Sequence, residues 1–241
     1  MEVLSLNNLS KAFSGEGENA SAIKSVSLTL SEGDSIYIQG EDKHALTGLI
    51  MLMGLVIKPD SGSICIEAED AAGLKEKARA ALRNRYFGYI GDGFPVVEGW
   101  SVIKNVSLPL VYSKERLGNT GRRSRTRELL DIVGLSDKAR TRVGLLTRNE
   151  KIKMQVARAF VNNSTIILAD NPLEGLEHGE GEEIMELIFT LLDKEKIFVM
   201  AAVDSSFSDR FSHRLILKDG TLMEEYWGRN ESGDERVYTV Y

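Results

Sequence analysis

Apolar and polar positions follow two different periods along the central part of the chain. Short apolar runs of strand length alternate with stretches whose apolar residues recur at helical spacing. The expected strands are residues 36–39, 86–90, 164–170 and 197–202, and the expected helices are residues 46–56, 75–85, 149–160 and 182–194. Because buried strands that alternate with helices form a mainly parallel sheet covered on both faces, the pattern predicts an α/β fold.

Other strands lie outside this alternation. Residues 1–13 and 22–30 alternate with period two, which is typical of strands with one buried face. The further strands expected from the same pattern are residues 63–67, 214–217 and 221–226, the last two joined by a hairpin turn at residues 218–220. The first part of the chain is therefore expected to add an antiparallel β subdomain to the parallel sheet.

A block in the middle of the chain is mostly helical. We expect a helical subdomain at about residues 96–163, in which the apolar helical run 102–111 is broken by Pro109. The whole of residues 1–226 is expected to be a single domain. Residues 227–241 form a charged tail that is expected to be either an added edge strand or disordered.

Composition narrows the class of protein. The chain has 241 residues, of which 42% are hydrophobic, and its net charge of -6 argues against non-specific binding to nucleic acid. The single cysteine, Cys65, lies in an apolar run and is expected to be a buried small hydrophobe. No signal peptide and no apolar run of about 20 residues is found, so we expect a cytoplasmic protein that reaches a membrane only through a partner.

The loop after the strand at residues 36–39 carries the candidate chemistry. A phosphate-binding P-loop has the pattern Gly-x-x-x-x-Gly-Lys-Ser/Thr between a strand and a helix, and its backbone N–H groups surround a phosphate. Gly40 and Thr47 match the first and last positions of this pattern. Ala45 stands in place of the second glycine and Leu46 in place of the lysine, so the loop has the right length but lacks the cation.

Several short motifs occur in a characteristic order. They are Phe13 before a glycine-rich loop, residues 40–47, residues 105–110 (Asn-Val-Ser-Leu-Pro-Leu), residues 156–159 (Val-Ala-Arg-Ala), residues 166–172 (Ile-Ile-Leu-Ala-Asp-Asn-Pro), Gly175-Leu176 and residues 218–220 (Lys-Asp-Gly). In this order they resemble the nucleotide-binding subunit of an ABC transporter, and most closely the lipoprotein-release and macrolide-efflux type. The resemblance implies a P-loop NTPase-type (ABC ATPase) fold, with the antiparallel β subdomain and the helical subdomain described above.

The resemblance also implies which positions correspond to a nucleotide site. Phe13 falls where the family stacks an aromatic ring on adenine, and Lys43 and Ala45 fall on the loop glycines. Thr47 and Asp170 fall on the magnesium ligands. The remaining positions are Leu46 for the phosphate lysine, Asp92 for the glutamine that senses the γ-phosphate, Thr147, Arg148 and Asn149 within the signature sequence, Asn171 for the catalytic glutamate, Glu177 for an aspartate and Val203 for the switch histidine.

These replacements lead to the expectation of a pseudo-ATPase with a structural or regulatory role. A P-loop NTPase acts mainly by positioning phosphates and stabilising their charge, and Leu46, Asn171 and Val203 supply none of the groups that do so. We therefore expect no catalytic residues, no resident metal, and Mg-ATP bound only weakly if at all. The expected partners are an integral membrane permease and a second ABC ATPase subunit, in a homodimer or heterodimer, with no nucleic acid.

A contact surface for the permease is implied by the same resemblance. Phe94, Val96, Val97 and Trp100 fall in the groove that takes the permease's coupling helix, and we expect them to be exposed apolar residues.

Alternatives remain open at this point. The chain would be a slow but genuine ATPase if Lys43, Thr47 and Asp170 serve the nucleotide, or a module that binds another ligand in the same cleft. Arg148 could reach across a dimer to a carboxylate such as Asp42 or Asp92. The basic run at residues 122–127 is either a solvated helix face or a site for phospholipid headgroups or an acidic partner.

Overall fold

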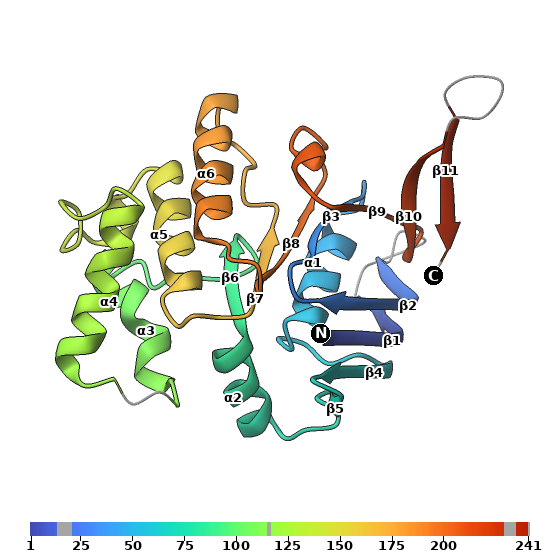
Figure 1. The fold of residues 1–241 in the computed structure, drawn as a ribbon, viewed down its shortest axis with the longest axis horizontal. Helices are drawn as coiled ribbons and strands as arrows, with labels where there is room; N and C mark the ends of the chain where they lie inside the picture. The colour runs from blue at the N-terminus through green and yellow to red at the C-terminus, as the bar shows by residue number, and fades with distance from the viewer. Residues whose placement is uncertain (14–20, 115–116, 229–234, 241) are drawn as a thin grey trace. The chain divides into compact units, whose positions relative to one another are not determined.

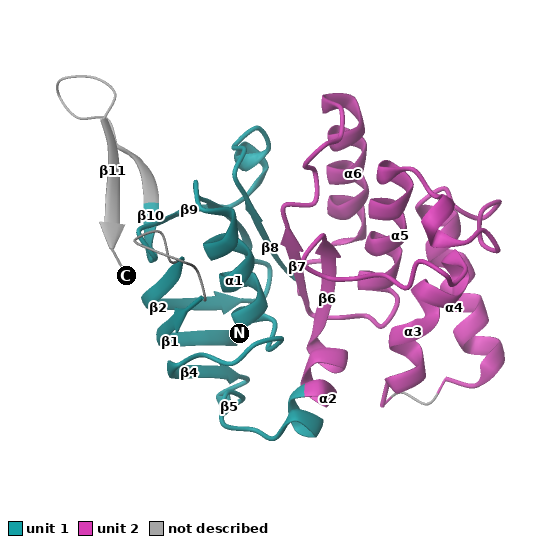
Figure 2. Ribbon diagram, turned by 180° about the vertical axis from the view of Figure 1, so that it is seen from behind, with its two compact units in different colours: residues 1–79, 197–241 teal, residues 80–196 magenta. Residues whose placement is uncertain are grey.

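The computed structural model describes residues 1–13, 21–114, 117–228 and 235–240, and side chains as far as residue 224. The chain divides into two compact units, residues 1–79 with 197–241 and residues 80–196 (Figure 2). The glycine-rich loop expected after Phe13 lies largely outside the described residues.

The first unit contains the predicted antiparallel sheet. Its strands are β1 (Glu2–Ala12), β2 (Ala22–Ser31), β4 (Ser61–Ile66) and β5 (Glu69–Asp70), in the order β2-β1-β4-β5 (Figure 1). Leu6 faces Leu28 on one side and Ile64 on the other. Leu4 and Leu6 therefore lie in the core, and Leu9 joins them after a register shift between Leu6 and Leu9.

The first unit also contains the strand that leads to the candidate loop. This strand, β3 (Ser35–Gln39), pairs in parallel with β8 (Ile197–Ala202) and with β9 (His213–Lys218). Beyond β9 follow the antiparallel strands β10 (Thr221–Gly228) and β11 (Glu235–Val240). After β3 the chain enters α1 (Lys43–Met53), which contacts both β8 and β2.

The second unit combines two parallel strands with the helical block. Strand β6 (Phe87–Gly91) pairs with β7 (Ile166–Asp170), and its helices are α3 (Val102–Tyr112), α4 (Asn119–Ile132), α5 (Arg148–Phe160) and α6 (His178–Leu191). Helix α2 (Glu76–Tyr86) contains the boundary between the units. Single 3₁₀ turns occur at Val143–Leu145 in this unit and at Ser208–Arg210 in the first unit.

Two expectations about the elements are corrected. The helical run from residue 102 does not break at Pro109, because α3 continues through it to Tyr112. The helix packs against α4 and α5, and the side-chain amide of Asn84 donates a hydrogen bond of 2.9 Å to the Pro109 carbonyl. The last long helix begins at His178, four residues earlier than residue 182, since the Glu180 carboxylate accepts from the Glu177 N–H and stabilises an earlier first turn.

No helix among the residues described is long and apolar enough to cross a membrane.

Close packing of β6 on α5 gives a test of the second unit. A Cβ on Gly88 would lie 2.4 Å from the Ala159 carbonyl oxygen, so Gly88→Ala forces backbone to move. We expect this substitution to lower the free energy of unfolding by about 1–3 kcal/mol, measured by urea denaturation. Gly99→Ala is the matched control, because nothing lies within 4 Å of its added Cβ. Equal destabilisation by both would contradict the packing described.

Candidate functional site

A carboxylate in the loop between β3 and α1 caps the N-terminus of α1. Asp42 is the N-cap residue of α1, and its Oδ1 accepts hydrogen bonds from the backbone N–H of His44 (2.9 Å) and of Ala45 (3.1 Å). The first N–H groups of a helix have no partner within the helix, and they bind either a capping side chain or an anion. Here two of them already bind Asp42.

The Asp42 carboxylate is held in its charged form. Burial raises its pKa, but hydrogen bonds from the Ser21 hydroxyl and from the Ala45 and His44 amides together outweigh burial and bring the pKa below the ordinary value of 3.8. Near neutral pH, a negative charge therefore lies at the N-terminus of α1, where the helix dipole favours it.

Leu46 lies in the protein interior. Its exposed fraction is 1%, and a Cβ built on Gly40 would lie 3.3 Å from Leu46 Cδ2 and 2.8 Å from the Leu217 carbonyl oxygen. Gly40 is thus needed because the chain approaches β9 too closely for a side chain. Ala45 is also buried, whereas Lys43 is exposed in the first turn of α1 and Thr47 is half-buried.

Phe13 packs on the same helix. Its Cζ atom lies only 2.1 Å from where a Cβ on Gly48 would be, so the ring rests directly on the backbone of α1 next to Thr47. The Phe13 N–H donates to the Ser21 carbonyl oxygen (3.0 Å), which holds the residue at the end of β1.

Val203 follows β8 and carries no polar group. Its side chain is 42% exposed, and its carbonyl oxygen accepts from the Gln39 side-chain amide at 3.5 Å. The next residue, Asp204, accepts through its carbonyl oxygen from the Tyr37 hydroxyl, and burial together with the Asp204 charge raises the pKa of Tyr37. The side chains of Tyr37 and Gln39 on β3 therefore hold the backbone of this segment, and the Val203 side chain takes no part in these hydrogen bonds.

In the second unit, Arg148 joins three predicted site regions. Its Nη1 forms an ion pair of 2.9 Å with Asp92 Oδ1, and its Nε donates to the Glu174 carbonyl oxygen at 2.8 Å. Its Nη2 is buried and has no hydrogen-bond partner in the described part of the chain. Within the chain the guanidinium is therefore paired with Asp92, while contact with a carboxylate of another subunit stays a prediction.

The N-terminus of α5 is capped in the same way as that of α1. The Thr147 side chain accepts from the Glu150 N–H (3.3 Å), and the Glu150 carboxylate accepts from the Thr147 N–H (3.0 Å). Lys138 also donates to Glu150, and this hydrogen bond is the largest of the causes that hold the pKa of Glu150 below its ordinary value. Asn149, next to Arg148, is half-buried in this first turn.

Asp170 and Asn171 stand at the end of β7. Asp170 is 4% exposed, and the close approach of its carbonyl oxygen to Gly91 leaves no room for a side chain there. Asn171 has a φ of 44°, a left-handed conformation that asparagine tolerates well. Its side-chain amide donates to Glu174 Oε2 at 2.8 Å, so the amide is oriented by the chain that follows.

The expected permease-contact residues are only partly exposed. Phe94 is buried, with an exposed fraction of 6%, and the centre of its ring lies 4.4 Å from the centre of the Tyr89 ring. The prediction that Phe94 is exposed is therefore wrong. Val97 is 39% exposed, whereas Val96 and Trp100 are half-buried. Lys104 Nζ lies 3.8 Å from the centre of the Trp100 ring, a cation–π contact.

A half-buried arginine holds the turn that carries Phe94 and Pro95. The Arg158 guanidinium donates to the carbonyl oxygens of Phe94 (3.2 Å) and Pro95 (3.0 Å). Burial lowers the pKa of Arg158 to about 10, which leaves it charged near neutral pH. The turn that carries Phe94 is therefore anchored to α5.

Sequence reasoning missed several residues of these sites. Asp42, Glu150 and Glu174 act through hydrogen bonds to backbone groups or to neighbouring side chains, as the distances above show. Asp42 and Glu150 had a detectable signal, because an acidic residue at a helix start and the spacing Thr-x-x-Glu are capping patterns. Glu174 had none, since its contact with Arg148 depends on the folded chain.

The chain belongs to the ABC transporter family, whose profile matches residues 23–174. Its fold is that of an ABC nucleotide-binding domain, as predicted: it superposes on the dimeric structure of MJ0796, a bacterial ABC transporter cassette, with a TM-score of 0.81 and 26% identity, over 90% of this chain and 95% of that one. A second structure of MJ0796, in a post-hydrolysis state with ADP and Pi, gives the same values.

Two relatives show the type of subunit. The chain is 32% identical to the lipoprotein-releasing system ATP-binding protein LolD 1 of Rhodopirellula baltica, over 92% of this chain and 96% of the relative. It is 27% identical to the macrolide export ATP-binding/permease protein MacB of Aggregatibacter actinomycetemcomitans, over 93% of this chain and 35% of that longer protein. Both lie in the type predicted from the motifs.

The cap of α1 can be tested by stability. We expect Asp42→Ala to lower the free energy of unfolding by about 1 kcal/mol, because two N–H groups lose their acceptor. Asp42→Asn is the matched control, since asparagine caps a helix about as well and removes only the charge. Urea denaturation at neutral pH measures both. A fully stable Asp42→Ala variant would show that the carboxylate does not hold these amides.

The same cap predicts a pH dependence. Because the pKa of Asp42 is lower in the folded protein, its stabilisation is complete above the ordinary value of 3.8 and is lost as the pH falls through the folded-state value. The stability difference between wild type and Asp42→Ala should therefore be constant from about pH 7 to 5 and shrink at lower pH. A difference that grows as the pH falls would contradict this sign.

Proposed function

We propose that the chain is a catalytically silent nucleotide-binding-domain subunit of a membrane ABC transporter, a pseudo-ATPase with a structural or regulatory role. The observation that carries the proposal is the Asp42 carboxylate on the N-terminal amides of α1, together with the burial of Leu46 beside it. In this proposal the chain binds Mg-ATP weakly if at all.

The charge of Asp42 opposes a triphosphate at this loop. A triphosphate that reached these amides would have to displace Asp42 from two hydrogen bonds and would still lie close to its negative charge. Leu46 offers no cation in compensation, and its side chain is directed into the interior. Phe13, which packs on Gly48, is engaged with the helix itself.

The residues of the second unit support the same proposal. Asn171 is an amide, which cannot accept a proton as a carboxylate does, and its N–H donates to Glu174. Arg148 is paired with Asp92, so the position that corresponds to a signature glycine carries a large, engaged side chain. Val203 in the first unit has no hydrogen-bonding side chain. Each such group contributes tenfold or more to catalysis, or about 1.4 kcal/mol per tenfold.

The proposed partner is an integral membrane permease, with the subunit on the inner face of the membrane in a homodimer or beside another ABC ATPase. The relatives support a permease partner. One is the ATP-binding protein of a lipoprotein-releasing system, and another is named as an ATP-binding/permease protein. Val96, Val97 and Trp100 are the proposed contact residues.

Hydrolysis is the first test. We expect the isolated protein to release no phosphate from Mg-ATP above the level of an Asp170→Ala variant, since the lysine, glutamate and histidine positions are all replaced. A steady-state phosphate-release assay measures this. Turnover near one per second that is lost in Asp170→Ala would instead favour the slow ATPase that uses Lys43, Thr47 and Asp170.

Restoring the loop is the second test. The variant Asp42→Asn/Ala45→Gly/Leu46→Lys removes the competing charge and returns the glycine and the cation. We expect it to bind Mg-ATP at least tenfold more tightly than the matched variant with Leu46→Gln, measured by calorimetry after circular dichroism has shown that both are folded. Equal binding by the two variants would mean that position 46 does not face a phosphate site.

Assembly is the third test. With no nucleotide to join two subunits, any dimer of this chain should form independently of ATP. Light scattering or native mass spectrometry, with and without Mg-ATP, is expected to give one and the same mass. A monomer that dimerises only when Mg-ATP is added would contradict the proposal.

A further inference from the structure

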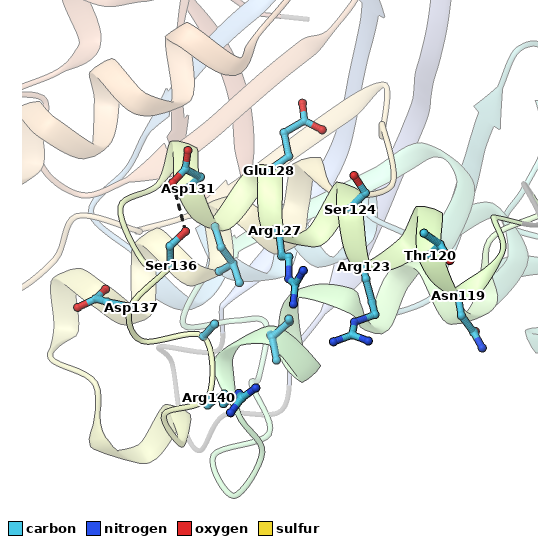
Figure 3. A pocket seen from close by; sticks show the side chains of 13 residues that line it. Asn119, Thr120, Arg123, Ser124, Arg127, Glu128, Asp131, Ser136, Asp137 and Arg140 are labelled. Atoms are coloured by element: carbon cyan, nitrogen blue, oxygen red, sulfur yellow. Dashed lines mark hydrogen bonds between the residues drawn. The ribbon is translucent and has the colours of Figure 1, made fainter.

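A second site is indicated by a groove on the helical part of the second unit. The groove has a volume of about 1270 Å³ and runs along α4 to the segment that follows it (Figure 3). Its lining residues come from α3 (Ile103), from α4 (Asn119, Thr120, Arg123, Ser124, Arg127, Glu128, Leu130 and Asp131), and from the following segment (Ser136, Asp137, Ala139 and Arg140). None of them belongs to the predicted nucleotide positions.

Three arginines define the chemistry of the groove. Arg123, Arg127 and Arg140 are all exposed, and their guanidinium groups lie on the same side of α4 (Figure 3). In the part of the chain that the structure describes, no carboxylate pairs with any of the three. A guanidinium presents a planar fork of N–H donors that matches the oxygens of a phosphate.

The acidic residues of the groove are engaged or directed elsewhere. Glu128 forms an ion pair of 3.1 Å with Arg125, and its carboxylate points away from the three arginines (Figure 3). Asp131, four residues after Arg127 and so at a suitable spacing to pair with it, instead accepts a hydrogen bond of 3.3 Å from the Ser136 hydroxyl. Asp137 is exposed at the groove, and its charge adds to the larger effect of Glu150 in raising the pKa of Lys138.

Two of the three arginines destabilise α4, and the packing of the core does not explain their presence. Arg123 and Arg127 are four residues apart on one helix face, and like charges at this spacing destabilise a helix. The buried face of α4 consists of Thr126, Leu129 and Leu130, so the two arginines do not belong to the core. A bound anion would relieve the repulsion between them.

The start of α4 adds neutral donors and a favourable dipole. Asn119, Thr120 and Ser124 line the groove beside the arginines. Gly118, the N-cap residue, makes no side-chain cap, and the helix dipole favours an anion at this end of α4.

From these contacts we propose that the groove binds a phosphate group with more than one negative charge, through Arg123, Arg127 and Arg140. The source of this group is either the headgroup of an anionic phospholipid or a free phosphorylated molecule. The site is separate from the proposed nucleotide positions and does not depend on whether the chain hydrolyses ATP.

The test uses the full chain and two probes. Inorganic pyrophosphate, followed by calorimetry, represents the free source, and vesicles of phosphatidylcholine with added phosphatidic acid, followed by co-sedimentation, represent the lipid source. Arg127→Gln is the test variant. Arg142→Gln is its matched control, because Arg142 is exposed and carries the same charge but does not line the groove. Circular dichroism shows that both variants are folded.

We expect Arg127→Gln to weaken binding of one probe about tenfold or more, and Arg142→Gln to change it less than about twofold. Loss of vesicle binding assigns the lipid source, and loss of pyrophosphate binding assigns the free source. Arg140→Gln should behave as Arg127→Gln does. Absence of binding to both probes, or equal weakening by Arg142→Gln and Arg127→Gln, would overturn the proposal.

Discussion

The structure depends on how the exposed amides at the start of α1 are satisfied. Helix N-termini need an acceptor, and the connection from β3 to α1 can provide either a bound phosphate or a side chain. In this chain Asp42 accepts from two of these amides, and its pKa is held low enough to keep the charge. The N-terminus of α1 is therefore capped without a ligand, and the Leu46 side chain is buried in the core.

A similar solution occurs at the start of α5. Thr147 and Glu150 form a reciprocal cap, Lys138 supports Glu150, and Arg148 is directed to Asp92 and to the Glu174 carbonyl. In both units the groups that the family resemblance assigns to phosphate binding are engaged with the chain itself. This supports a subunit whose fold is kept by internal contacts rather than by a nucleotide, within the ABC transporter family to which the chain belongs.

The sequence predicted the fold well because strands buried on both faces, such as β7 and β8, give continuous apolar runs. It failed where tertiary contacts override local signals: α3 continues through Pro109, and Phe94 lies in the interior against Tyr89. The site positions followed from motif spacing. Asp92 was named as a partner of Arg148 across a dimer, but the pairing within one chain was not predicted, because Asp92 lies 56 residues away along the sequence. The arginine groove was visible only as a basic run, since Arg140 joins it through folding.

The central claim is that the chain no longer needs or holds a nucleotide, and direct binding of Mg-ATP to the unmodified protein tests it. Isothermal calorimetry on the full chain, with the Asp170→Ala variant alongside, gives the dissociation constant. The account predicts a constant no tighter than about millimolar, which corresponds to about 4 kcal/mol, and no difference between the two proteins. A micromolar constant that is weakened by Asp170→Ala would contradict it.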